Sequence, residues 1–188
     1  MIKIGITGSI ASGKTTASKI LSHRRGPLFN ADEVVKKLYK TSSFRRILFK
    51  KFQLKKKSNL KKILKNKIFN DRLNLLKLEK IIHPVVRKEM KKFSITHRKK
   101  EMIFYDIPLL VESKLMNYFD LIFFIKAKKK TRKKRFKNRG GDEKLFNILN
   151  NKQFSDRIKT KLCDYVVVNE KNLNILKTNL SDIMKNHV

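Results

Sequence analysis

The residues with the clearest chemical meaning form a glycine-rich segment near the amino terminus. Gly8 to Thr15 match the pattern G-x-x-x-x-G-K-[S/T] in full. In such a segment backbone N–H groups curl around phosphate oxygens, the lysine reaches the β- and γ-phosphates, and the last hydroxyl binds the bridging Mg²⁺. The segment predicts nucleoside triphosphate binding, with Lys14 on the phosphates, Thr15 on the metal ion, and the following residues in contact with the nucleotide: Gly8, Ser9, Ile10, Ala11, Ser12, Gly13, Lys14, Thr15 and Thr16.

Two aspartates could act on a phosphoryl acceptor. Asp32 could accept the proton of an acceptor hydroxyl and orient its oxygen, or it could serve only as a helix N-cap. Asp106 ends an apolar segment, at a place where ligands of α/β sheets gather, and could hold Mg²⁺ through water or position the acceptor. The sequence leaves both pairs of roles open.

Three arginines and one histidine are further candidates. Arg132, Arg135 and Arg139 are spaced by three and four residues, so on a helix they would share one face. That face could clamp phosphates, as lids of small kinases do, or it could be a solvated basic surface. His83 precedes Pro84 in a segment with helical spacing, where a structural or capping role is the alternative.

Alternating short strands and helices would position these residues. Apolar patterns predict strands at 2–7, 28–31, 102–106, 121–125 and 165–168, and helices at 14–25, from Asp32 onward, at 126–138 and at 173–184. Residues 41–100 have helical spacing interrupted at His83-Pro84, and the 139–142 loop is free to hinge. We predict an α/β three-layer fold with a parallel sheet in a single unit over 1–188, a helical insertion at 41–100 and a lid region at 128–160.

Composition limits the other possibilities. The formal net charge is +33, from 48 Lys and Arg against 15 Asp and Glu, which would attract nucleic acid or phosphorylated metabolites. The basic residues are spread along the chain, however, which favours a compositional bias over a nucleic-acid-binding surface and leaves only non-specific nucleic-acid binding. A single cysteine excludes an internal disulfide and no apolar run reaches membrane-span length, so we expect a soluble cytoplasmic protein. We predict no stable protein partner.

The sequence also narrows the class of nucleotide-binding protein. It contains neither an Asp-x-x-Gly switch segment nor an Asn-Lys-x-Asp base-reading segment, which argues against a regulatory GTPase. A short chain with a helical insertion and a basic segment near its end suits a kinase for a small acceptor. The alternatives are another nucleoside or nucleotide kinase, and a nucleic-acid-binding ATPase.

Five ordered segments resemble dephospho-coenzyme A kinases. They are Thr7–Thr15, Asn30–Asp32, Ile82–Pro84, Asp106–Glu112, and Gln153 together with Cys163–Asn169. The resemblance implies a five-stranded parallel core with an acceptor-binding helical domain and a lid. It also implies transfer of the γ-phosphoryl of ATP, with Mg²⁺, to the ribose 3′-hydroxyl of dephospho-coenzyme A.

The resemblance assigns roles to individual residues. Asp32 falls on the base and Lys14 on the phosphate lysine, while Arg135 and Arg139 fall on lid positions that meet phosphates. Asn169 would lie near the adenine of ATP. Acceptor-binding positions are expected at Asp32, His83, Asp106 and Lys61.

Three positions depart from the family pattern. Asn30 stands where the family usually has Asp, Ser9 where Gly is common, and Lys61 where Arg is usual. A second carboxylate beside the base is therefore missing, and Lys61 keeps the charge but loses the bidentate fork of arginine.

Overall fold

Two compact units make up the structure. The computed structural model describes residues 1–54, 60, 63–64, 67 and 72–187. One unit, which we call the sheet unit, contains Met1–Asn30 and His97–Val188, and the other, the helical unit, contains Ala31–Thr96.

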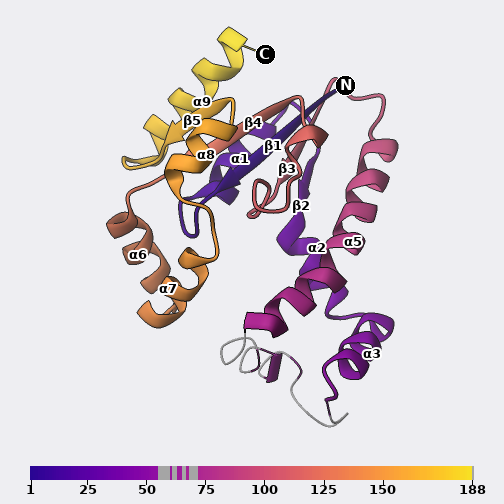
Figure 1. Cartoon of the computed structure of the whole chain (residues 1–188). Coiled ribbons are helices and arrows are strands. Elements are labelled where there is room, and N and C mark those ends of the chain that lie inside the picture. The colour runs from indigo at the N-terminus through magenta and orange to yellow at the C-terminus, as the bar shows by residue number, and fades with distance from the viewer. Residues whose placement is uncertain (55–59, 61–62, 65–66, 68–71, 188) are drawn as a thin grey trace. The chain divides into compact units, whose positions relative to one another are not determined.

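A five-stranded parallel sheet organises the sheet unit (Figure 1). The strands lie in the order β2-β3-β1-β4-β5 and are β1 (Ile2–Gly8), β2 (Leu28–Asn30), β3 (Met102–Asp106), β4 (Leu121–Lys126) and β5 (Tyr165–Val168). The predicted α/β fold with five parallel strands is confirmed. The register places Asp106 beside both Ile6 and Asn30, so the carboxyl ends of β1, β2 and β3 meet at one edge of the sheet.

Helices α1 (Lys14–Ser22) and α9 (Leu173–His187) cover one face of the sheet. Side chains of successive strand residues alternate between faces, so Ile4 and Ile6 point to the same side. Both are fully buried in a cluster with Ala17 and Leu21 of α1 and Leu180 of α9. This core fixes the start of α1 against the end of β1, where the glycine-rich segment lies.

The chain between β3 and β4 covers the opposite face. It contains a short 3₁₀ helix, η1 (Met116–Tyr118), and packs closely over Gly5 of β1. A Cβ atom at Gly5 would lie 2.7 Å from Leu110 Cδ1 and 2.9 Å from Phe119 Cγ. Glycine is needed here because any side chain would displace that covering segment.

Three helices occupy the predicted lid region. They are α6 (Lys129–Lys137), α7 (Glu143–Asn151) and α8 (Asp156–Leu162). Asp142 and Ser155 cap α7 and α8 by accepting from the N–H groups of Leu145 and Ile158. These caps define where the two helices begin and so fix the segment between them.

The helical unit contains α2 (Ala31–Leu38), α3 (Ser42–Lys51) and α5 (Arg72–Thr96) among its described residues.

Two predicted helix boundaries in this unit were wrong. Because α2 already begins at Ala31, Asp32 lies in its first turn rather than at the N-cap. Helix α5, which is 25 residues long, continues through Pro84. Proline removes one helical hydrogen bond, and the hydrogen bonds of the remaining residues keep the helix continuous.

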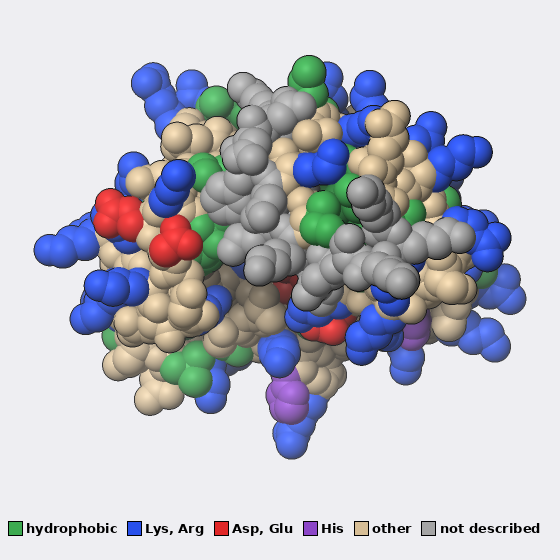
Figure 2. Space-filling view, turned by 90° about the horizontal axis from the view of Figure 1, so that it is seen from below, with side chains coloured by type: hydrophobic (Ala, Val, Ile, Leu, Met, Phe, Trp, Pro, Cys, Tyr) green, Lys and Arg blue, Asp and Glu red, His purple; other side chains and the backbone are tan. Residues whose placement is uncertain are grey.

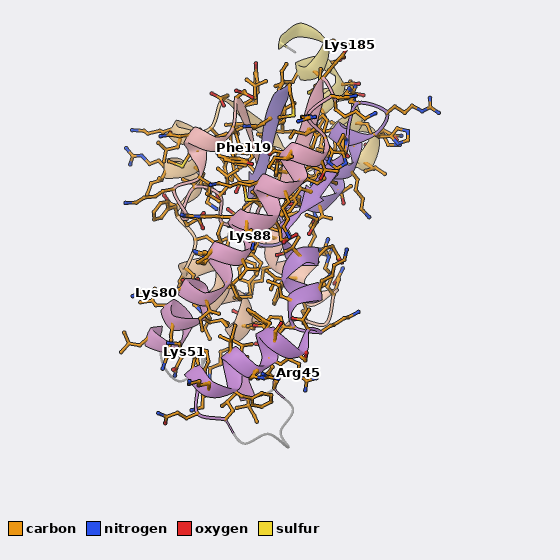
Figure 3. All side chains as sticks on the ribbon, turned by 90° about the vertical axis from the view of Figure 1, so that its right-hand side faces the viewer. Arg45, Lys51, Lys80, Lys88, Phe119 and Lys185 are labelled. Carbon is orange, nitrogen blue, oxygen red and sulfur yellow. The ribbon has the colours of Figure 1, made fainter. Side chains whose placement is uncertain are left out.

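Basic side chains are distributed over both units. Arg45, Lys51, Lys80 and Lys88 are exposed on α3 and α5 (Figure 3), and Lys and Arg are scattered over the face seen in Figure 2 rather than gathered in one patch. Within the described part of the chain, none of the helices combines the length and apolar character needed to cross a membrane.

Candidate functional site

The glycine-rich segment, Gly8–Thr15, joins β1 directly to α1, as its mechanism requires. Gly13 has a φ of 93°, and a Cβ atom there would collide with the side-chain nitrogen of Asn169. A Cβ atom at Gly8 would lie 2.9 Å from the carbonyl oxygen of Ile125. Both glycines are therefore required by backbone conformation or by close approach, and Ala11 also adopts a positive φ of 59°.

Lys14 forms a buried ion pair at the edge of the sheet. Its ammonium group contacts Asp106 Oδ1, and the Asp106 side chain is fully buried. The other Asp106 oxygen accepts from Asn30 Nδ2 at 2.9 Å. The structure thus brings three residues singled out in the sequence into one cluster: Lys14, Asp106 and Asn30, the last of which stands where the family usually has Asp.

Two more predicted residues contact the glycine-rich segment through one carbonyl oxygen. Asn169 Nδ2 donates to Ser12 O at 2.8 Å, and Arg135 Nη1 donates to the same oxygen at 3.3 Å. The hydroxyl of Ser12 is buried and has no hydrogen-bond partner within the described chain. The segment is therefore held from the side of β5 and α6, with one buried polar group left for a ligand.

Sequence reasoning gave no role to two side chains that bind the same segment. Asp156 Oδ1 accepts from Ser9 Oγ at 2.6 Å, and Gln153 Oε1 accepts from the backbone N–H of Ile10 at 2.7 Å. The only sequence signal for Gln153 was that it lies at the spacing found in dephospho-coenzyme A kinases, and this spacing does not say what the residue does. No local pattern marks Asp156, because its partner is 147 residues away.

The three arginines have different environments. Arg132 is buried, donates to Ala127 O at 3.0 Å and to Asn150 Oδ1 at 2.7 Å, and lies over the ring of Phe146. Burial lowers the pKa of Arg132, but the usual value for arginine is high enough to keep the charge. Arg139 is exposed and follows the end of α6, so the predicted single helical face of all three arginines is wrong.

The remaining candidates belong to the helical unit. Asp32 is exposed in the first turn of α2, and His83 is half-buried within α5. Lys61 lies outside the described residues. Their acceptor-binding roles, and that of Asp32 as base, stay predictions.

His83 should make stability depend on pH. Burial, helped by Arg87 and opposed by Glu79, lowers its pKa below the usual 6.5. The folded state then binds fewer protons than the unfolded state, so stability present above about pH 6.5 is lost as the pH falls towards the folded pKa. Thermal melting between pH 7.5 and 5.5 should show a midpoint that falls with pH, and His83→Gln should flatten this slope. Equal slopes in wild type and His83→Gln would contradict the prediction.

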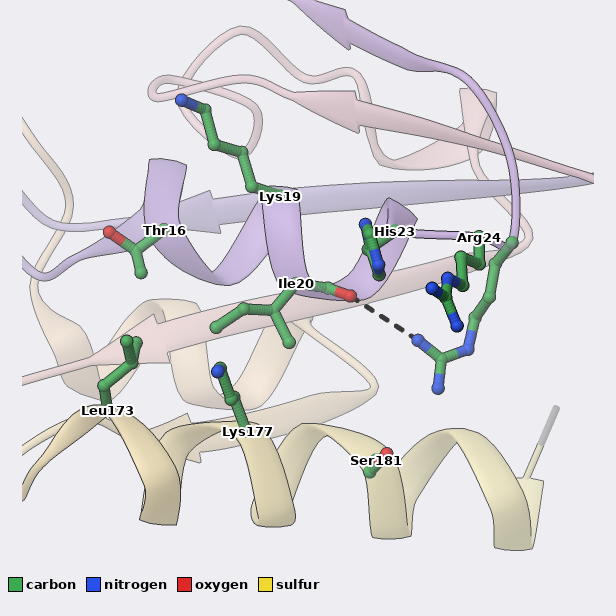
Figure 4. Close-up of a pocket in the computed structure, with 9 residues that line it drawn as sticks. Thr16, Lys19, Ile20, His23, Arg24, Leu173, Lys177 and Ser181 are labelled. Carbon is green, nitrogen blue, oxygen red and sulfur yellow. Dashed lines mark hydrogen bonds between the residues drawn. The ribbon is translucent and has the colours of Figure 1, made fainter.

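A basic groove of about 780 Å³ runs between α1 and α9 (Figure 4). Its lining includes Lys19, His23, Arg24 and Lys177, and it meets the glycine-rich segment only near Thr16. None of the contacts described above lies in this groove. Its basic character follows the charge of the whole surface.

The oxygen groups at the sheet edge fit a magnesium ion. Mg²⁺ prefers carboxylate and hydroxyl oxygens, and usually retains several waters beside one or two carboxylates and substrate phosphates. Thr15, an exposed residue, supplies a hydroxyl, and Asp106 supplies a fully buried carboxylate whose two oxygens contact Lys14 and Asn30. Among the described residues there is no cluster of three or more His, Cys, Asp or Glu that would form an all-protein metal site. The donor set fits an ion held largely by water and by a bound nucleotide.

Comparisons with known proteins agree with one another. The family model described as dephospho-CoA kinase matches residues 2–174. A dephospho-CoA kinase from Bartonella quintana is 34% identical over 97% of this chain and 96% of its own length. A dephospho-CoA kinase from Rickettsia typhi is 31% identical over 99% of this chain and 97% of its own length. The solved dephospho-CoA kinase from Campylobacter jejuni superposes with a TM-score of 0.67 at 23% identity, covering 97% of this chain and 95% of that one. The last comparison bears on the fold alone.

Proposed function

This chain belongs to the dephospho-CoA kinase family, and we propose how its residues carry out the family reaction. In that reaction the γ-phosphoryl group of ATP moves to the ribose 3′-hydroxyl of dephospho-CoA. The P–O bond to the 3′-oxygen forms, the bond to the β–γ bridging oxygen breaks, and the products are CoA and ADP. The observation that supports this role most directly is the Lys14–Asp106 pair beside the glycine-rich segment.

Phosphate binding would fall to the glycine-rich segment and Arg135. Lys14 would exchange its contact with Asp106 for the β- and γ-phosphates, and the loop N–H groups and Ser12 hydroxyl would face the remaining oxygens. Arg135 already donates to this loop, so a small side-chain movement would bring it to the transferring group. Arg139 would add a second positive charge from the exposed turn that follows α6. These donors stabilise charge that spreads over the phosphoryl oxygens in the transition state.

Proton transfer would fall to Asp32. Its carboxylate would accept the proton of the 3′-hydroxyl as that oxygen attacks, which orients the oxygen and keeps it from becoming a free alkoxide. His83 and Lys61 of the helical unit would bind the acceptor. When bound, Mg²⁺ would be held by Thr15 and, through water, by Asp106, and would neutralise phosphate charge. The cytoplasmic location also remains a prediction.

Measured ADP production would test this function. The assay uses Mg-ATP with dephospho-CoA, a panel of nucleosides and nucleotides, and RNA, each with purified full-length chain. We expect turnover with dephospho-CoA alone. Turnover confined to a nucleoside would support the alternative small-molecule kinase, and turnover that requires RNA would support the nucleic-acid-dependent ATPase.

The Asn30 departure gives a separate prediction. Asn30→Asp would replace the donor to Asp106 with a second carboxylate 2.9 Å from it, and two like charges at that separation repel. In EDTA the melting midpoint should fall by about 3–6 °C, because a cost of about 1–2 kcal/mol shifts a chain of this size by that amount. Added Mg²⁺ should raise the midpoint of Asn30→Asp more than that of wild type. The control Asn174→Asp makes the same charge change on the exposed side of α9, and an equal response to Mg²⁺ in both variants would contradict the prediction.

A further inference from the structure

The first half of the glycine-rich segment is held by one short stretch far along the chain. Ser9 is 4% exposed, and its hydroxyl donates to Asp156 at 2.6 Å. One residue later, the backbone N–H of Ile10 donates to Gln153 at 2.7 Å. Two consecutive loop residues are therefore bound by side chains that are three residues apart.

That stretch is itself fixed to the sheet unit. Glu112 Oε1 accepts from the backbone N–H of Phe154 at 2.9 Å and pairs with Lys159 Nζ at 2.8 Å. The Lys159 side chain is fully buried, and Glu112 belongs to the covering segment that follows β3. Lys159 Nζ and Glu112 Oε2 are buried and have no hydrogen-bond partner within the described part of the chain, so either charge left alone in the interior would be costly. Residues 153–159 therefore form a brace with a fixed position relative to β3.

Phosphate binding requires such a fixed position. Loop N–H groups stabilise an anion most when they already converge before the anion arrives, because no free energy is then spent on ordering them. The N–H of Ile10 already donates a hydrogen bond to Gln153, so it does not need a phosphate oxygen as its acceptor. The direction of this Ile10 N–H instead sets the path of the loop towards Ser12 and Gly13. The loop also closes on itself, because Ser12 N donates to Ser9 O at 3.0 Å.

We propose that Gln153 and Asp156 are positioning residues that hold Gly8–Ser12 in its phosphate-binding shape, with the buried Glu112–Lys159 pair as their anchor. Asp156 acts only because this chain has Ser9, as glycine at that position has no hydroxyl to donate. The inference rests on the proposed function, since it takes the phosphates of ATP as the ligand. Neither residue touches the reacting atoms in this role.

Steady-state kinetics of a double-mutant cycle would test the Asp156 contact. Asp156→Ala and Ser9→Ala should each raise KM for ATP about tenfold, the effect of losing a hydrogen bond to a charged group, and leave KM for dephospho-CoA within about twofold. The double variant should be no worse than either single variant, because both remove the same contact. Asp156→Asn keeps an acceptor oxygen and should restore most of the affinity. Glu143→Ala, which removes an acidic residue from the first turn of α7, is the matched control and should leave both KM values unchanged.

Amide hydrogen exchange would test the Gln153 contact without using catalysis. Gln153→Ala should speed exchange of the Ile10 N–H at least tenfold, with the melting midpoint nearly unchanged. Unchanged exchange at Ile10, or cycle variants that raise both KM values and lower the melting midpoint together, would overturn the inference. If the wild-type chain did not phosphorylate dephospho-CoA, the proposed function would fail, and the exchange rate of Ile10 would still decide whether the brace exists.

Discussion

Replacing Lys14 with methionine should lower kcat/KM for ATP by about a thousandfold. The ammonium group is the only lysine charge within the glycine-rich segment, and loss of a charged donor to a transferring phosphoryl group has an effect of that order. Methionine keeps similar length and packing but provides neither charge nor donor. Steady-state kinetics with dephospho-CoA as acceptor would measure the change.

The Lys14 variant needs a control for stability. Asp106 is fully buried, so removing its cation leaves an uncompensated charge at a cost of about 3–5 kcal/mol, and the melting midpoint should fall. The double variant Lys14→Met/Asp106→Asn removes both charges and should regain much of this stability. Its activity should remain far below that of Asp106→Asn alone. If the double variant matched Asp106→Asn in kcat/KM, Lys14 would be a structural partner of Asp106 rather than a phosphate ligand.

Replacing Asp32 with asparagine should lower kcat by about a thousandfold, within the range found when a positioned general base is removed. Asparagine has nearly the same shape but cannot accept the proton of the 3′-hydroxyl. KM for ATP should change little, because the phosphates are bound by other residues. Since Asp32 is exposed, the melting midpoint should also change little.

Glu33 provides the matched control for Asp32. It is the next residue in the first turn of α2, is also exposed, and pairs with Lys36 at 2.7 Å. Glu33→Gln removes the same charge from the same helix terminus, so any effect on the helix dipole is reproduced. We expect its kcat to stay within about twofold of wild type. A similar loss in both variants, or full activity in Asp32→Asn, would exclude Asp32 as the base.

Helix boundaries show where local patterns were insufficient. The prediction that His83-Pro84 interrupts the helical segment followed from the restriction that proline places on its neighbour, yet α5 continues through it. A missing hydrogen bond can be offset when the rest of a long helix packs against other elements, and spacing alone does not report that packing. The start of α2 was also misjudged: the helix begins one residue earlier than predicted, which places Asp32 in its first turn.

The sequence by itself determined the five strands, the glycine-rich segment and Lys14 as its cation. These features are local: strand patterns repeat every two residues, and the loop conformation depends on glycines within eight consecutive positions. The ordered motifs also identified the family. Such information needs no knowledge of which distant residues meet.

Only the tertiary structure decided what holds the site together. The partners of Lys14, Ile10, Ser9 and Ser12 are Asp106, Gln153, Asp156 and Asn169, at separations of 92, 143, 147 and 157 residues. Strand order β2-β3-β1-β4-β5 and the path of α8 bring these side chains to one end of the sheet. A hydrogen bond across such a separation leaves no periodic signal in the chain, because its geometry depends on every element packed between the two residues.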